Sequence, residues 1–489
     1  MIAGLLRVGA LQLAVMLVLV ARTKGLALWL GPEWLGLMSV IDKLLALFAQ
    51  TAAFSLPLAA VRFLPAALQN NSGEMTAIWR AMRNWLVLTL ALAMATGLAL
   101  ATFSPGLLGA ELVGHRDILL VAFASLPAIM FVPFLQNSLS AHGEPTAALT
   151  STLLNALGLT ASAFLGVWLA GLRGLYLVYA VFGICFVALS LRRLSRKFNG
   201  GVWVGPPRGR FSLPREIWRF VMIMRPLAIA GPFALLFVNY RVLQLEGAAA
   251  AGWMQAAFAI AIAASTVLSA GNLAMHTPNV SRGGTPQELM NRAEEYLCAS
   301  GFLAAVCLPP LLLFPKTVIS ILYSQEFHPA TAVLAIFLIA KLLELAVGAV
   351  QAIVIALDHM KFHVVENVLV QLLVIAAAIV LIPRFGITGA ALSLALESLC
   401  LLLVSTTFLL HRHALQMPTR PLWLWIFLLS AAISCRALAP LPEWQPQPLL
   451  LRACLYAAII GGAFILAPTS LRTQLRSLLR PGRRDSTRS

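Results

Sequence analysis

Long apolar runs separated by short polar segments make up almost the whole of this sequence. A run of about 17–25 apolar residues can cross the hydrocarbon core of a bilayer as a helix. A helix also satisfies its own backbone hydrogen bonds, which lipid cannot do. The sequence therefore predicts an all-α integral membrane protein with 14 transmembrane helices. These helices are expected at residues 5–28, 36–63, 85–104, 117–139, 147–170, 174–191, 221–245, 252–274, 297–314, 331–357, 363–382, 387–410, 421–438 and 449–468.

The composition excludes the main classes of soluble protein. Of the 489 residues, 60% are hydrophobic and 11% are charged, whereas soluble domains average about 45–50% and about 25%. Such a chain cannot cover its surface with polar groups in water, so a soluble enzyme, a nucleic-acid-binding domain and a secreted disulfide scaffold are all excluded. The net charge of +17 is therefore interpreted through the positions of the charges, and no nucleic-acid partner is expected.

Lysine and arginine residues are distributed unevenly between the predicted loops. Loops after even-numbered spans, together with the two termini, hold 23 of the 35, whereas loops after odd-numbered spans hold 8. Cytoplasmic loops of membrane proteins carry the excess of these residues. We therefore expect a multi-pass protein with both termini in the cytoplasm.

The two halves of the chain repeat short features at a nearly constant spacing. A duplicated six-helix unit explains this spacing, and because six is even, both copies have the same orientation in the membrane. The alternative is a coincidence of short glycine turns between helices. The features recur 215 or 216 residues apart: Gly31 and Gly36 with Gly247 and Gly252, Gln136 with Gln351, and Gly171 and Gly174 with Gly386 and Gly389.

This repeat predicts how the chain is divided. Two pseudo-symmetric six-helix bundles are expected at residues 1–191 and 221–410, joined by a basic cytoplasmic linker at 192–220. Two further helices would occupy 411–468, and a basic cytoplasmic tail would occupy 469–489. Two parallel lobes around a site at the membrane midplane are typical of transporters.

Four segments together carry a family resemblance that covers the first twelve predicted spans. They are Arg22 to Gly36 (RTKGLALWLGPEWLG), Ala60 to Pro65 (AVRFLP), Leu322 to Phe327 (LYSQEF) and Ile382 to Ala391 (IPRFGITGAA). In order and spacing they resemble the polysaccharide and oligosaccharide-lipid flippases, the polysaccharide transporter (Wzx-type) family of the multidrug/oligosaccharidyl-lipid/polysaccharide exporter superfamily. The seventh span departs from that pattern, because it reads Asn239-Tyr240-Arg241 where many relatives place an acidic residue.

The resemblance implies two six-helix bundles that form a V around a central cavity. It also implies alternating-access export of an oligosaccharide linked to a polyprenyl diphosphate across the bacterial inner membrane. Such export would serve cell-surface polysaccharide biosynthesis: lipopolysaccharide, O-antigen or exopolysaccharide. The expected partners are the lipid-linked substrate, membrane lipids and other polysaccharide assembly proteins. H+ and Na+ are the candidate coupling ions, and no cofactor is expected.

Charged residues inside predicted spans are the most informative individual positions. Each costs roughly 2.5–3.5 kcal/mol at the centre of a membrane helix, so it should face a cavity or another charge. Lys341 and Glu344 lie three residues apart on one helical face and suggest a structural or gating pair. Asp42 and Lys43 are adjacent, so their side chains point about 100° apart and do not readily share a partner. Six such positions are Asp42, Lys43, Arg225, Arg241, Lys341 and Glu344.

Basic residues among these suggest a cationic cavity for a diphosphate. Lys43, Arg241 and Arg225 would bind the anion, since a guanidinium donates two parallel hydrogen bonds to a phosphate. The alternative is that they snorkel to the headgroups or form structural ion pairs. Arg22 and Lys24 lie at the outer mouth, where receiving the substrate and snorkelling are both open.

Acidic residues elsewhere provide coupling candidates. Glu366 and Glu397 are isolated carboxylates within spans and could bind a proton or cation. His359 and His363 have a metal-like spacing of four, but no further ligand is clustered with them, so no metal site is expected.

Two alternatives to a flippase remain open from the sequence. One is a cation-coupled small-molecule antiporter of the same superfamily, and the other is a membrane polymerase of glycan assembly. The first outer loop offers only Glu33 as a carboxylate, and no Walker A, GxSxG or HExxH motif is present. We therefore do not expect an enzyme.

Overall fold

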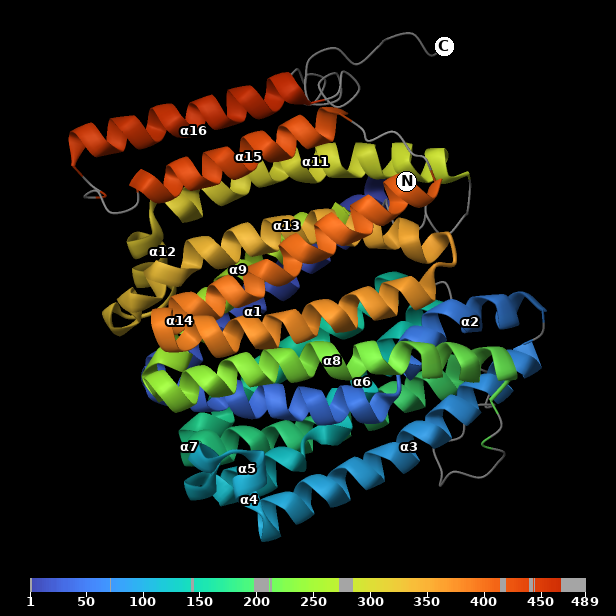
Figure 1. Ribbon diagram of the computed structural model, residues 1–489. Helices are drawn as coiled ribbons and strands as arrows, with labels where there is room; N and C mark the ends of the chain where they lie inside the picture. Colours follow the sequence, from blue (N-terminus) through green and yellow to red (C-terminus); the bar gives the residue numbers. More distant parts are fainter. Residues whose placement is uncertain are drawn as a thin grey trace, which may run out of the picture.

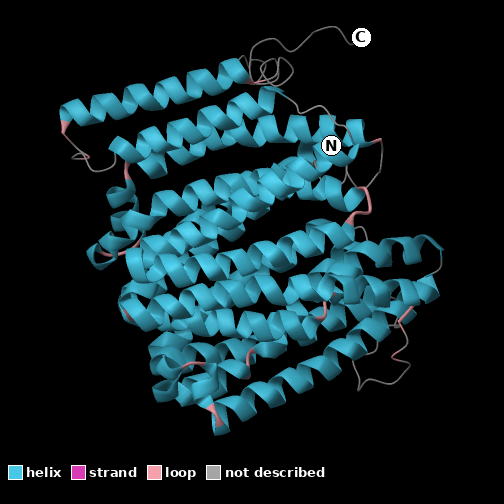
Figure 2. Cartoon of the chain, in the orientation of Figure 1, coloured by secondary structure: helices cyan, strands magenta, loops and turns pink. Residues whose placement is uncertain are grey.

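The computed structural model describes residues 2–70, 72–141, 145–197, 211, 213–271, 285–413, 419–438, 443 and 445–467. The predicted tail at 469–489 and about half of the predicted linker at 192–220 (residues 198–210 and 212) lie outside these ranges. Every regular element in the described residues is a helix (Figure 2). The elements are α1 (Ile2–Ala53), α2 (Leu56–Asn70), α3 (Ser72–Phe103), α4 (Pro105–Leu108), η1 (Ala110–His115), α5 (Arg116–Phe123), α6 (Leu126–Ala141), α7 (Pro145–Lys197), α8 (Arg215–Glu246), α9 (Ala248–Gly271), α11 (Pro286–Leu313), α12 (Pro315–Leu322), η3 (Gln325–Ala330), α13 (Thr331–Ala356), α14 (Met360–His413), α15 (Thr419–Leu438) and α16 (Pro446–Leu466).

Long helices account for the predicted spans. Within the described residues, ten helices are long and apolar enough to cross a membrane, and the bent pair η1–α5 and α6 makes an eleventh. Three of them, α1, α7 and α14, each contain a non-helical break at a glycine and so consist of two arms. Counted as arms, the spans number fourteen, which confirms the predicted fold class.

The breaks in the long helices are turns. A Cβ atom on Gly166 would lie 2.5 Å from the carbonyl oxygen of Gly174, so the two arms of α7 touch beside their turn at Gly171. For α1, Figure 1 shows the N-terminus and the following helix α2 on the same side of the molecule, so this helix also folds back. We call the side with these turns, at the left in Figure 1, the hairpin end, and the opposite side the termini end.

The predicted repeat is visible in the backbone. Gly31 (φ 71°, ψ 178°) and Gly247 (φ 87°, ψ 174°) adopt one conformation, while Gly171 (φ 60°, ψ −141°) and Gly386 (φ 55°, ψ −135°) adopt another. Glycine alone enters such left-handed regions without strain. The short helices η1 and η3 likewise begin and end 215 residues apart. We call residues 2–197 the N-lobe and residues 213–413 the C-lobe.

The lobes meet where α1 packs against α8 and α9. At the hairpin end, a Cβ atom on Gly36 would overlap the carbonyl oxygen of Ala248 and lie 2.7 Å from the amide nitrogen of Gly252. A Cβ atom on Gly252 would overlap the carbonyl oxygen of Pro32. Small residues allow membrane helices to approach this closely. The glycines that marked the repeat thus form the contact between its two copies.

The last two helices join the C-lobe alone in the described structure. Figure 1 shows α15 and α16 beside α11. The indole nitrogen of Trp425 donates to the carbonyl oxygen of Leu297 at 3.2 Å, and the hydroxyl of Tyr456 donates to that of Val306 at 2.9 Å. Glu443, between the two helices, accepts from the backbone nitrogen of Lys316 at 3.0 Å at the start of α12.

Candidate functional site

A lysine and a glutamine connect the two lobes inside the membrane region. The Lys43 ammonium, on the second arm of α1, donates to Oε1 of Gln255 on α9 at 2.5 Å. At 1.5 Å per residue, Lys43 lies roughly 18 Å along its arm from the turn at Gly31, which is near the middle of a bilayer about 30 Å thick. The hydrogen-bond partner of this cation is a neutral amide, and the neighbouring Asp42 attracts the ammonium without forming an ion pair with it, so its positive charge is only partly compensated.

An aromatic ring lies between two lysines at this level. The Lys43 and Lys341 ammonium groups lie 5.8 Å and 5.2 Å from the centroid of Phe258. The Phe258 ring is held by an edge contact with Phe337, with centroids 5.3 Å apart. Cation–π attraction is strongest where water is excluded. The site therefore gathers one cation from each lobe around a single ring.

The predicted pair Lys341 and Glu344 is present, since the ammonium contacts Oε2 of the carboxylate. These two residues border a cavity of about 380 Å³ inside the C-lobe. Glu397 also lines it and accepts from Nε2 of Gln371 at 2.6 Å. Two carboxylates and one ammonium thus face one space. Glu366, the other predicted coupling residue, does not line it, and accepts from the hydroxyl of Ser405 at 2.6 Å.

The N-lobe side of the site holds Asp42 and Arg22. Asp42 accepts from the hydroxyl of Tyr176 on α7 at 2.9 Å, so it and Lys43 contact different helices, as their adjacent positions predict. Arg22 lies over the ring of Tyr179, 5.0 Å from its centroid. The Nε atom of Arg22 is buried and has no hydrogen-bond partner among the described residues.

The remaining predicted cations lie away from this centre. Arg241, about one and a half turns before the hairpin end of α8, donates through Nη1 to Gln244 at 2.7 Å, and its buried Nε has no partner in the described part of the chain. Arg225 stacks on Phe54 at 4.3 Å near the termini end of α8. Lys24 is exposed. The structure therefore brings together Lys43 and Lys341 rather than Lys43 and Arg241.

Sequence reasoning missed the uncharged members of the site. Gln255, Phe258 and Tyr176 carry no charge, and an aromatic residue in a membrane span is ordinary. A signal existed only for Gln255, which interrupts the apolar run of α9. The predicted histidines contact different partners: His359 lies 3.0 Å from His413 between ring nitrogens, and His363 contacts Asn367. Within the described ranges, no group of three His, Cys, Asp or Glu could hold a metal ion.

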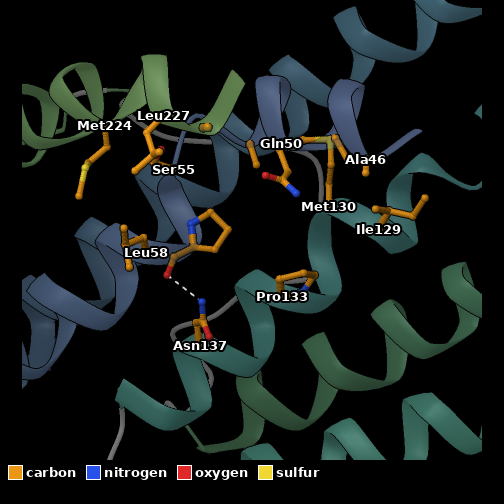
Figure 3. Close-up of a pocket in the computed structure, with 14 residues that line it drawn as sticks. Ala46, Gln50, Ser55, Leu58, Ile129, Met130, Pro133, Asn137, Met224 and Leu227 are labelled. Carbon is orange, nitrogen blue, oxygen red and sulfur yellow. Dashed lines mark hydrogen bonds between the residues drawn. The ribbon is translucent and has the colours of Figure 1, made fainter. Parts of the chain in front are cut away.

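A second cavity opens between the lobes nearer the termini end. It measures about 470 Å³ and lies between α1, α2, α6 and α8, with mainly apolar walls (Figure 3). Figure 3 shows Met130 and Ile129 on one wall and Leu227 on another. Asn137 donates to the carbonyl oxygen of Pro57 at 3.1 Å beside it. Gln50 adds a second amide to the lining of this mainly apolar cavity.

Comparison with solved structures identifies proteins of the same fold. No family model and no curated protein matches the sequence. The structure described as the lipid II flippase MurJ in an inward closed conformation is 12% identical, with a TM-score of 0.68 over 94% of this chain and 98% of that one.

Two MATE transporters are also similar in structure. An inward-facing multidrug resistance MATE transporter of the MOP superfamily is 11% identical, with a TM-score of 0.61 over 83% of this chain and 98% of that one. A eukaryotic MATE transporter is 11% identical, with a TM-score of 0.60 over 88% and 97%. The chain therefore has the fold shared by the MurJ flippase and the MATE transporters of the MOP superfamily.

Proposed function

We propose that this protein is a flippase that moves a polyprenyl-diphosphate-linked oligosaccharide across the bacterial inner membrane by alternating access. Both termini would be cytoplasmic, and the hairpin end would face outward. One observation carries the proposal: the Lys43 ammonium lies between the lobes at mid-membrane depth and has a neutral partner. Burying a charge that is only partly compensated is costly, so an anionic substrate that supplies further negative charge is favoured there.

Unused donors support an anionic cargo. The buried Nε atoms of Arg22 and Arg241 have no acceptor among the described residues, whereas the Lys341 ammonium beside Phe258 is already paired with Glu344. Arg241 lies closer to the hairpin end than Lys43. A diphosphate that leaves Lys43 would meet this guanidinium next, and a guanidinium binds phosphate oxygens in pairs. The cations would then mark successive positions along one path.

The apolar cavity between α2, α6 and α8 supports a lipid carrier. Its lining includes Leu58 and Ile129, which are partly exposed on the membrane side of the protein. Apolar walls would hold the first isoprene units of the carrier while the diphosphate occupies the polar centre. Membrane lipid would occupy the cavity between cycles.

A cation-coupled small-molecule antiporter is the second candidate. The cavity bordered by Glu344, Glu397 and Lys341 favours it, because two carboxylates in one space suit an organic cation or a coupling ion. Under this alternative the carboxylates, and not Lys43, would determine transport. The fold is shared by flippases and antiporters and does not separate the two.

A deletion strain with variant complementation tests the proposal. Lipid-linked repeat units should accumulate in the inner leaflet of the deletion strain. Lys43→Ala should fail to restore export at normal membrane abundance, whereas Lys43→Arg should restore part of it. Lys361→Ala is the matched control, since this lysine is exposed and outside the site. Arg241→Ala should also impair export, and Arg241→Lys should retain part of it because it keeps the charge but loses the paired donors.

Other outcomes would redirect the assignment. Full export by Lys43→Ala at normal abundance would contradict the proposal. If the deletion strain loses drug tolerance but exports glycan normally, and Glu397→Gln fails to restore that tolerance, the antiporter would be established. Intact translocation with unpolymerised repeat units in the deletion strain would establish a polymerase.

A further inference from the structure

A pocket of about 510 Å³ lies at the hairpin end of the N-lobe, away from the central site. Three turns build it: the turn of α1, the junction of η1 with α5, and the turn of α7. Its lining includes Trp29, Trp34, His115, Asp117 and Arg173. No step of the proposed transport path uses these residues.

The pocket combines fixed aromatic rings with accessible polar groups. Trp29 is 57% exposed and Trp34 is 43% exposed. The Trp29 ring packs against Phe164 with centroids 5.3 Å apart, and the Trp34 ring packs against His115 at 5.7 Å. Arg173 forms an ion pair with Asp117, and both side chains remain partly open to the pocket. The indoles are therefore held in place while their faces stay available.

The C-lobe shows that the fold does not require these side chains. Its equivalent turns have the same glycine conformations at Gly247 and Gly386 as the N-lobe has at Gly31 and Gly171. Yet the five equivalent positions carry small or aliphatic residues and no ionisable group. They are Leu245, Ala250, Ala330, Ala332 and Thr388, at the spacings of 216 and 215 found in the repeat.

We propose that this pocket binds a pyranose ring of a carbohydrate. A pyranose presents a C–H face that packs on an indole and a rim of hydroxyls that hydrogen-bond to a carboxylate, a guanidinium or an imidazole. The pocket offers both kinds of surface within one space. A tryptophan that only anchors the protein at the membrane interface needs no ion pair beside it.

The identity of the ligand rests on the proposed function. If the hairpin end faces outward, the glycan of the translocated lipid emerges on this side. The pocket would hold its sugars as they leave the central cavity, and so favour release outward. Sugar binding itself is measurable without any transport.

Saturation-transfer NMR on the purified full-length protein in detergent tests the inference. The probes are methyl β-D-glucopyranoside and N-acetylglucosamine, with the acyclic polyol sorbitol as a negative control. Ring C–H protons of at least one pyranose should receive saturation, and sorbitol should not. Trp34→Ala should raise the apparent Kd about tenfold, while Trp34→Phe should raise it less.

A matched control separates binding from membrane anchoring. Trp168 is 76% exposed, lies near the turn of α7 and does not line the pocket, so Trp168→Ala should bind the probe like the unaltered protein. Asp117→Asn provides a second test that leaves both indoles in place, and it should also weaken binding. Thermal unfolding in parallel identifies any variant that fails to fold.

Two results would overturn the inference: no saturation transfer to either pyranose, or equal transfer in Trp34→Ala, Asp117→Asn and the unaltered protein. Neither result would bear on the role proposed for the central site at Lys43. Conversely, Lys43→Ala should bind the probe normally although it fails to export. If the protein binds sugar but Lys43→Ala exports fully, the proposed function would be wrong and the sugar-binding pocket would still stand.

Discussion

The N-lobe and the C-lobe share a backbone plan but not a chemistry. Their turns at Gly31 and Gly247 match within 16° in φ, and η1 and η3 occupy equivalent positions. At the hairpin end, however, the N-lobe holds tryptophans and an ion pair where the C-lobe holds aliphatic residues. Side chains that occur in only one of two like-folded lobes are not needed for the fold, which makes them the best candidates for function.

The same reasoning applies at the centre of the membrane. The position of Asp42 in the N-lobe corresponds to Phe258 in the C-lobe, and the position of Lys341 corresponds to Leu126. Glu397 corresponds to Phe182. Each buried charge thus has an apolar counterpart in an equivalent helix. Because an intramembrane charge is costly and the fold does without it on the other side, these three residues are candidates for binding or coupling.

The largest effect should follow from a change where the lobes touch. Gly252→Ala places a methyl group against the carbonyl oxygen of Pro32, and because backbone rather than a flexible side chain must move, the cost should reach or exceed about 3 kcal/mol, the upper end of the usual range for overpacking. Thermal unfolding in detergent and membrane abundance should both fall. Gly231→Ala is the control, because a Cβ atom there meets nothing within 4 Å. Equal stability of the two variants would show that the lobes do not meet backbone to backbone.

A smaller effect is expected inside the N-lobe. Tyr176→Phe removes the hydroxyl that donates to buried Asp42, and a buried acceptor without its donor costs about 1–3 kcal/mol. Tyr179→Phe is the matched control, since that hydroxyl lies beside Arg22 and makes no hydrogen bond to Asp42. The transition temperature should fall for the first variant and stay or rise for the second. If Tyr179→Phe lowers the transition temperature more than Tyr176→Phe does, then Tyr176 is not the residue that stabilises Asp42.

The smallest effect is expected at the termini end, where the lobes meet through an ion pair. Arg62 lies 3.8 Å from Asp358, and both side chains are well exposed. Asp358→Asn should lower stability by at most about 1 kcal/mol, and added salt should remove the difference. Asparagine also tolerates the positive φ of 60° at this position. A loss as large as that of Gly252→Ala would mean that the termini end holds the lobes together equally strongly.

Much of the fold could be predicted from the sequence, because apolar run length fixes the spans and the glycine spacing reveals the duplication. The contact of Lys341 with Glu344 was also predictable, since helix geometry alone brings them together. The link from Lys43 to Gln255 was not. It depends on the rotation of α1 against α9, and no periodicity within one helix determines how two helices face each other.

The placement of the arginines shows the same limit. Arg241 and Lys43 are both intramembrane cations in the sequence, but their depths along α8 and α1 separate them. Depth could be estimated by counting from Gly247 and Gly31. Whether the two cations serve one transport path or two separate sites depends on how the lobes pack against each other. The sequence does not contain that information.

The glycine contact between the lobes has a mechanical consequence. Gly36 and Gly252 present bare backbone to each other, so no side chain of one helix inserts between those of the other at this point. Helices whose side chains interlock resist relative movement, whereas helices that meet backbone to backbone through glycines have no side chains to disengage. In this structure the contact closes the hairpin end, and because no side chains interlock there, α1 and α9 can separate without first disengaging them, which release of a substrate on that side would require.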